Sequence, residues 1–153
     1  AQKVIDNVRS MGMAMTPCTL PGVGKPGFRL DEDEMELGMG IHGEPGICRE
    51  RMRPASEIAS LLLEHILADK DYTDSDVAVM VNGLGGTPLM ELYIVFNEVE
   101  KLLAAKGIRI YRSFVGNFMT SLEMSGCSVT LLKLDDEMKS LLDAPACTPA
   151  FHV

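Results

Sequence analysis

The fold class is decided by residues 77–92, which read VAVMVNGLGGTPLMEL. Residues 77–81 form an almost uninterrupted apolar run, which is typical of a strand covered on at least one face. Residues 82–88 join this strand to a helix, because Thr87 can cap a helix and Pro88 suits its first turn. Gly107 is the expected C-terminal stop of that helix. Its apolar positions recur at helical spacing, and they are Leu89, Leu92, Tyr93, Phe96, Val99 and Leu103.

Strands and helices alternate on both sides of this stretch. Apolar spacing predicts helices at 2–9 and 56–70, and a short last helix that begins at Asp135 or Asp136 and ends at Leu142. Strands are expected at 12–15, 35–41, 108–115 and 129–134. The strand at 35–41 alternates with period two and delivers His42 at its end, whereas residues 49–53 are interpreted as a solvated loop. Because there is no repeat and no internal linker, residues 1–153 are predicted to form a single α/β domain.

The composition of the chain argues against nucleic-acid and membrane partners. The chain has 153 residues, of which 46% are hydrophobic and 24% charged, and this fits one globular domain with a sizeable core. Its formal net charge of -8 argues against a nucleic-acid partner, since binding to a phosphate backbone needs clustered Lys and Arg. The sequence shows no apolar run of membrane-spanning length and no signal peptide, so we expect a cytoplasmic protein that has no membrane partner.

The cysteines give no sign of a metal centre. Cys18, Cys48, Cys127 and Cys147 are scattered, without a CxxC pair or a His/Cys cluster at zinc-ligand spacing. Free thiols are therefore predicted, and no residue is assigned as a metal ligand.

Two glycine-rich segments are candidates for the functional site. The first is residues 83–86, GLGG. It precedes a predicted helix, where exposed backbone N–H groups and the helix dipole can hold an anion. However, it lacks the GxGxxG spacing and a lysine for a phosphate. The favoured interpretation is a tight strand-to-helix turn that requires a positive φ.

The second segment, residues 38–46, reads GMGIHGEPG. Glycines on both sides of His42 leave its imidazole unscreened, as a reactive group needs and a packed core histidine does not. A neutral imidazole can attack an electrophilic carbonyl, and Glu44 could orient the ring or face solvent. The residues alone leave open whether His42 is reactive or is a turn histidine.

An ordered series of motifs along the chain resembles the dihydroxyacetone kinases, in their K domain or subunit. The segment around His42, residues 34–46 (EMELGMGIHGEPG), looks like the signature around the substrate-binding histidine of that family. Essentially the whole chain is covered by the resemblance. The further motifs, in order, are 16–19 (TPCT), 24–26 (GKP), 81–93 (VNGLGGTPLMELY), 120–126 (TSLEMSG), 143–145 (DAP) and 148–150 (TPA).

The resemblance implies a role for His42 and a fold. His42 is expected to form a hemiaminal with the ketone carbon of dihydroxyacetone, with Gly40, Gly43 and Glu44 as neighbouring substrate-binding positions. A covalent adduct discriminates against glycerol, which has the same hydroxyls but no carbonyl. The resemblance also implies a layered α/β fold with a mixed sheet packed by helices, of the DhaK/DegV-like kind.

The resemblance further implies that this chain is the C-terminal half of a K subunit. An N-terminal half, carrying the residues thought to assist the substrate hydroxyl, is expected to precede it, and Ala1 is not an initiator Met. No cofactor is expected on this chain, since ADP or ATP with Mg²⁺ belongs to a partner L domain or subunit. The K subunit is expected to be a homodimer. Because the chain ends shortly after residues 148–150, we expect the separate-subunit form, which takes phosphate from the phosphotransferase system.

The sequence leaves two alternatives open. A non-catalytic K-like subunit could sense dihydroxyacetone and contact a transcription regulator, and it would retain His42. Alternatively, the substrate could be a related ketose such as erythrulose. In each case this half alone is predicted not to phosphorylate anything.

Overall fold

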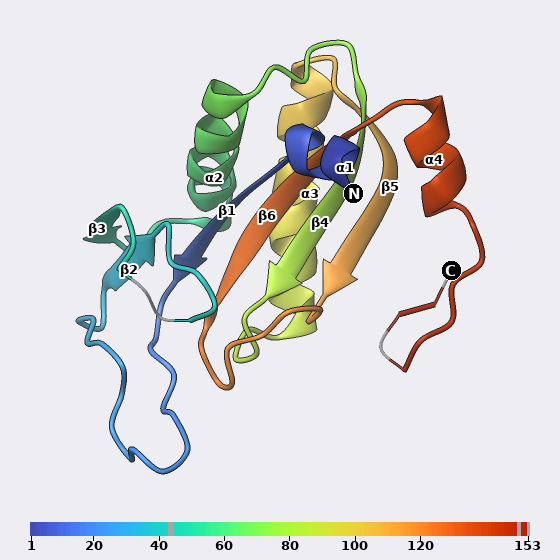
Figure 1. The fold of residues 1–153 in the computed structure, drawn as a ribbon. Helices are drawn as coiled ribbons and strands as arrows, with labels where there is room; N and C mark the ends of the chain where they lie inside the picture. The colour runs from blue at the N-terminus through green and yellow to red at the C-terminus, as the bar shows by residue number, and fades with distance from the viewer. Residues whose placement is uncertain (43–44, 150, 153) are drawn as a thin grey trace.

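The computed structural model describes residues 1–42, 45–149 and 151–152. Over these residues the chain forms a six-stranded sheet with the order β3-β2-β1-β6-β4-β5 (Figure 1). The pairing of β4 with β5 is parallel and the other pairings are antiparallel, so the predicted mixed sheet is confirmed. The strands are β1 (Val8–Ala14), β2 (Glu34–Leu37), β3 (Cys48–Arg51), β4 (Asp76–Gly83), β5 (Arg109–Gly116) and β6 (Gly126–Leu134).

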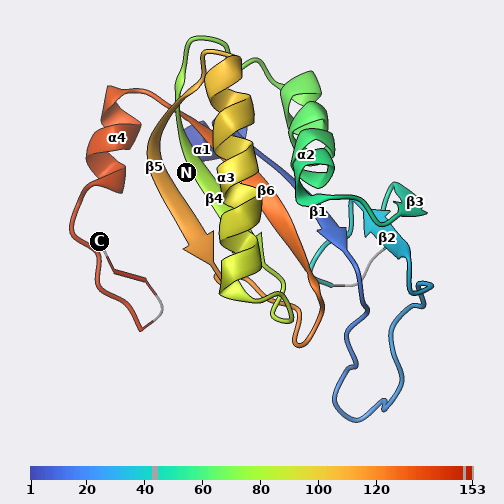
Figure 2. The ribbon, with the colours of Figure 1, turned by 180° about the vertical axis from the view of Figure 1, so that it is seen from behind.

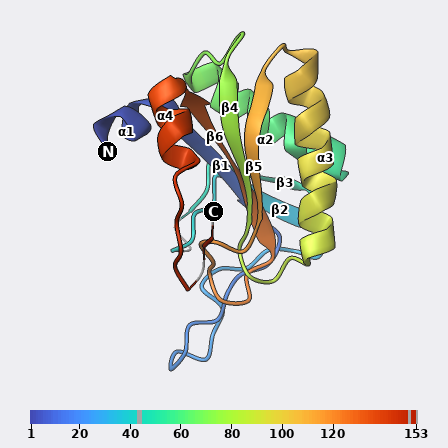
Figure 3. The ribbon, with the colours of Figure 1, turned by 90° about the vertical axis from the view of Figure 1, so that its right-hand side faces the viewer.

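The helices lie on two sides of this sheet. Two long helices, α2 (Ala55–Asp69) and α3 (Leu89–Ala105), cover one face (Figure 2). The short helices α1 (Gln2–Asn7) and α4 (Asp136–Leu142) lie on the opposite side (Figure 3). Figure 3 also shows that these short helices leave much of that second face without helical cover.

The main core fills the space between the sheet and the two long helices. Alternate residues of β1, β2, β4 and β6 point into it, as the period of two requires, and each fully buried Val or Leu contributes roughly 1.5–3 kcal/mol. The opposite residues of the same strands face the other side of the sheet. Core members with almost no exposed surface include Met13, Leu62, Val79, Val81, Leu92, Val99, Val129 and Leu131.

The elements predicted around residues 77–92 are confirmed within a residue or two. Gly107 has φ +71 and its N–H donates to Ala104 O, so it ends α3 as expected. Asp135 precedes α4 and accepts a hydrogen bond from the backbone N–H of Met138, which confirms the predicted helix start.

The N-terminal segment departs from its prediction. The expected helix at 2–9 ends at Asn7, because Val8, Arg9 and Ser10 already pair with β6 and extend β1 backwards. The strand expected at 35–41 ends at Leu37, since Gly38 has φ +78 and turns the chain out of the sheet.

Two further predictions were wrong. Residues 49–53 are not a simple solvated loop, because Cys48–Arg51 form the edge strand β3, paired with β2. Thr87 does not cap α3: its side-chain oxygen donates to Gly126 O and accepts from Gly126 N, both at 2.8 Å. The Thr87 hydroxyl, which was predicted to cap α3, therefore bonds instead to Gly126, a residue distant in sequence.

Candidate functional site

The turn that carries His42 leaves the sheet at the end of β2. The N–H of Gly38 donates to Gly12 O at 2.7 Å, which fixes the turn against β1. A Cβ atom at Gly12 would lie only 2.8 Å from Met39 O, so glycine is needed there for the turn to lie against the strand. This contact places residues 39–42 over the sheet face that lacks the long helices.

Two apolar side chains anchor this turn. Met39, which is 3% exposed, packs in a small core with Ala14, Leu84 and Met124, and the partly buried Ile41 joins this cluster. The imidazole of His42 follows immediately and is exposed. The alternation predicted for 35–41 thus has a physical basis, although only its first part is strand.

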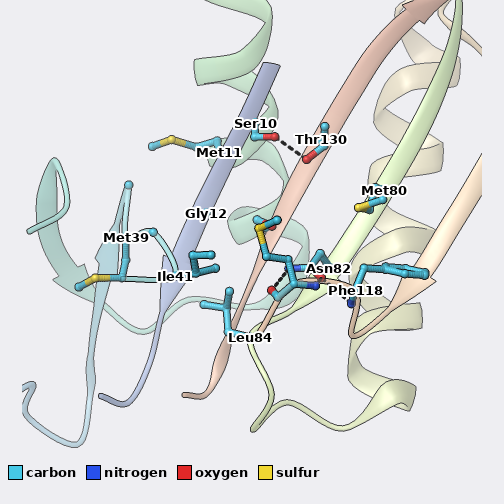
Figure 4. Close-up of a pocket in the computed structure, with 14 residues that line it drawn as sticks. Ser10, Met11, Gly12, Met39, Ile41, Met80, Asn82, Leu84, Phe118 and Thr130 are labelled. Atoms are coloured by element: carbon cyan, nitrogen blue, oxygen red, sulfur yellow. Dashed lines mark hydrogen bonds between the residues drawn. The ribbon is translucent and has the colours of Figure 1, made fainter. Parts of the chain in front are cut away.

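A cavity of about 510 Å³ lies beside this turn (Figure 4). Gly40 and Ile41 line one side of it, and Phe118 and Met119 line another. Figure 4 shows Ser10, Thr130 and Asn82 between them, on β1, β6 and β4, with their side chains on the sheet face away from α2 and α3. Their polar groups are the hydroxyls of Ser10, Ser128 and Thr130 and the amide of Asn82. The size and the few convergent polar groups are typical of a site for a small molecule.

Asn82 fixes the far wall of this cavity. Its side chain is 4% exposed, and its Oδ1 accepts hydrogen bonds from the backbone N–H groups of Phe118 and Met119, each at 2.9 Å. Its Nδ2 donates to Met119 O at 2.8 Å. All these bonds hold backbone, so Asn82 shapes the wall and its amide is already engaged.

Three of the sequence motifs meet next to the cavity. Ser125 N donates to the Thr16 hydroxyl, Thr19 N donates to the Glu123 carboxylate, and Ser121 N donates to Leu84 O. The pKa of Glu123 is lowered, because its own backbone N–H and that of Thr19 donate to the ionised carboxylate. Motifs 16–19, 81–93 and 120–126 therefore brace one end of the sheet.

The predicted site residues have different outcomes. Gly40 lines the cavity and His42 directly follows Ile41, which also lines it, whereas Gly43 and Glu44 lie outside the described residues. The segment 83–86 is the predicted tight turn: Gly85 has φ +118, and a Cβ at that position would lie 1.8 Å from Leu122 O.

Sequence reasoning missed the sheet residues that line the cavity. Gly12 carried a usable signal, because a glycine inside a strand often marks the close approach of another backbone. Ser10, Ser128 and Thr130 carried none, since they come from strands whose neighbours in the sheet are distant in sequence.

The cysteines, as predicted, are free thiols, with Cys18 and Cys127 buried and Cys48 and Cys147 exposed. Within residues 1–42, 45–149 and 151–152, no three His, Cys, Asp or Glu side chains gather as a metal site would require. No helix in that part of the chain is both long and apolar enough to cross a bilayer.

Comparison with known proteins identifies the family. A model of the Dak1 domain matches residues 1–150. The chain belongs to the Dak1 domain family. Among curated Dak1 relatives, the dihydroxyacetone-binding subunit DhaK of PTS-dependent dihydroxyacetone kinase 1 from Listeria innocua is 50% identical over 137 residues. That match covers 89% of this chain and 42% of the relative, so this chain spans less than half the length of that protein.

Solved structures of the family share the fold. The dihydroxyacetone kinase operon co-activator Dha-DhaQ superposes with a TM-score of 0.88 at 36% identity, covering 95% of this chain and 46% of that one. Dihydroxyacetone kinase from C. freundii, in complex with AMP-PNP and Mg²⁺, gives 0.76 at 31% identity, covering 92% and 26%. The predicted α/β architecture of a dihydroxyacetone kinase K domain is therefore confirmed.

Proposed function

We propose that this chain is the dihydroxyacetone-binding part of a dihydroxyacetone kinase, and that His42 holds the ketone as a hemiaminal. The observation that carries the proposal is that the exposed His42 directly follows two residues, Gly40 and Ile41, that line a cavity carrying several hydroxyl groups. Such groups suit a small polyhydroxylated substrate, and the Listeria innocua relative is named for binding this ketone.

The bond-forming step needs only the imidazole and the ketone. The lone pair of a neutral imidazole nitrogen attacks the ketone carbon, and the C=O π electrons move to oxygen. That oxygen takes up one proton while the other ring nitrogen releases one, so the adduct is the sum of its reactants. The adduct fixes the terminal hydroxyl, which then attacks a phosphoryl group in line. His42 acts as an anchor in this scheme and not as the general base.

The same proposal assigns the remaining parts of the reaction to partners. The N-terminal half of the K subunit supplies the residues that assist the hydroxyl, and a separate L domain or subunit carries ADP or ATP with Mg²⁺. The K subunit pairs as a homodimer in the cytoplasm and uses phosphate from the phosphotransferase system. The name of the Listeria innocua relative, a PTS-dependent kinase subunit, supports this phosphate source.

The test uses the full-length protein and dihydroxyacetone labelled with ¹³C at the ketone carbon. We expect the carbonyl signal to move into the region of tetrahedral carbon on binding, and the intact mass to rise by one whole dihydroxyacetone. His42→Ala should abolish both changes. His65→Ala, which removes another exposed imidazole on α2, is the matched control and should leave both intact. An adduct that persists in His42→Ala would disprove the anchor.

A second candidate function is a non-catalytic dihydroxyacetone sensor. The TM-score of 0.88 with the operon co-activator favours it, because that protein has the same fold over nearly the whole of this chain. Both functions retain the adduct, so the deciding measurement supplies a kinase L partner and a phosphate donor to the full-length protein. Formation of dihydroxyacetone phosphate indicates the kinase, and an adduct without phosphate transfer indicates the sensor.

The substrate can also be a related ketose. D-erythrulose kinase of Mycolicibacterium smegmatis is 44% identical over 144 residues, which cover 94% of this chain and 25% of that protein. Competition between dihydroxyacetone and erythrulose for adduct formation would rank the two ketones directly.

A further inference from the structure

Glu36 is a buried carboxylate in the middle of β2. It is 5% exposed and lies between Met35 and Leu37, which are almost completely buried. A buried carboxylate is costly unless it is paired and hydrogen-bonded. The partners of Glu36 therefore show what its burial achieves.

Within the described part of the chain, the partners of this carboxylate lie beyond the turn that carries His42. The N–H of Gly46 donates to Oε1 of Glu36 at 2.7 Å. The Nε of Arg49 donates to Oε2 at 3.1 Å, and Arg49 faces Glu36 across the β2–β3 pair. One side chain thus connects the strand before the turn to the backbone after it.

Backbone contacts make this closure tight. Ile47 N donates to Leu37 O at 2.7 Å. A Cβ at Gly46 would lie 2.0 Å from Leu37 O, so only glycine fits where the chain returns to β2. The chain segment that carries His42 therefore starts and ends at fixed points, and Glu36 holds the returning end.

We propose that Glu36 is a positioning residue that sets the placement of His42 through its hydrogen bond to the Gly46 N–H. The inference rests on the proposed function of His42 and adds a residue to it. A buried ion pair is often no more stabilising than apolar side chains of similar volume, whereas charge-assisted bonds to backbone fix geometry well. The bond between the Glu36 carboxylate and the Gly46 N–H is therefore suited to positioning the turn that carries His42.

The test measures adduct formation in full-length variants. Glu36→Leu keeps most of the buried volume and removes the acceptor, and we expect it to slow adduct formation by about 10- to 100-fold, as a displaced reactive group does. Glu36→Gln retains an oxygen that can accept from Gly46 N–H, and it should restore the rate to within a few-fold of the original protein. A Glu36→Gln variant as slow as Glu36→Leu would overturn the assignment to the Gly46 bond.

Tyr72→Phe is the control for general destabilisation. It removes a buried hydrogen bond, from the Tyr72 hydroxyl to Leu131 O, within the core beneath the long helices. If Tyr72→Phe lowers the free energy of unfolding as much as Glu36→Leu does, it should still leave the rate of adduct formation unchanged. If Tyr72→Phe slows the adduct as much as Glu36→Leu, the positioning role is wrong.

A second readout does not depend on the ligand. Hydrogen exchange of the peptide that spans residues 38–47 should accelerate in Glu36→Leu and stay slow in Glu36→Gln and Tyr72→Phe. If Glu36→Leu does not fold, Glu36→Met, which also lacks the acceptor for the Gly46 N–H, is compared with Glu36→Gln, and the latter should keep the exchange slower. If the original protein forms no adduct, the proposed function fails, while unchanged exchange in Glu36→Leu overturns the positioning role.

Discussion

At the scale of single residues, the site depends on two glycines at positions where a larger side chain would collide with a neighbouring backbone oxygen. Gly12 allows Met39 O to approach β1, and Gly46 allows the chain to return against Leu37 O. Neither position has the positive φ that Gly38 has, so the need at Gly12 and Gly46 is steric. These contacts bring two distant backbones close enough to hold the turn that carries His42.

We expect Gly46→Ala to slow adduct formation by at least tenfold, because its Cβ would displace the turn from Leu37 O. The matched control is Gly27→Ala, since a Cβ at Gly27 meets only Cys18 O at 4.0 Å. Adduct rates measured by mass spectrometry should separate the two variants. Equal rates in both would show that the closure at Gly46 does not set the geometry.

At the scale of elements, hydrogen bonds hold the loop between β4 and α3 against the start of β6. Thr87 is 7% exposed and bonds both backbone polar groups of Gly126, while Leu84 N donates to Gly126 O at 3.2 Å. Gly86 N donates to Met124 O, which adds another bond between the same two loops. The direction of α3 relative to the sheet thus depends on contacts outside the helix.

Thr87→Val keeps the shape of the side chain and removes its oxygen. It leaves the N–H of Gly126 without the partner it has in the native fold, and we expect a loss of roughly 1–3 kcal/mol in the free energy of unfolding. Thr87→Ser keeps the hydroxyl and should lose less. Urea unfolding measures both, and a Thr87→Val variant as stable as the original would contradict the role of this contact.

At the scale of the whole molecule, the core holds two weak acids that resist ionisation. Burial raises the pKa of the Cys127 thiol and that of the Tyr72 hydroxyl, each to about 12. The unfolded chain releases these protons near their ordinary values of 9.0 and 10.0, while the folded chain retains them. Above pH 9 the unfolded state therefore binds fewer protons than the folded state.

The free energy of unfolding should accordingly fall as the pH rises from 9 to 12. The raised pKa values of Lys3 and Lys139, each due first to a hydrogen bond with an aspartate, act in the same direction. Urea unfolding at several pH values measures the slope, and Tyr72→Phe should make it shallower. A stability that stays constant or rises over this range would contradict the prediction.

Much of the fold was predictable from local pattern. The apolar run at 77–81, the helical spacing from Leu89 to Leu103 and the stop at Gly107 each express a rule that acts within a few residues. The edge strand β3 and the backward extension of β1 were not predictable in this way. Their backbones are held by strands elsewhere in the sheet, and their own residues carry no strong pattern.

The sequence by itself determined the family, the alternation of strands and helices, and His42 as the residue to test. Only the tertiary structure decided that Glu36 is buried, that Thr87 binds Gly126 and that Ser10, Thr130 and Asn82 share one cavity. The physical reason is the separation in sequence over which each kind of interaction acts. Periodicity and turn chemistry report on neighbours in the chain, whereas a cavity and a buried carboxylate are defined by groups that folding brings together from distant positions.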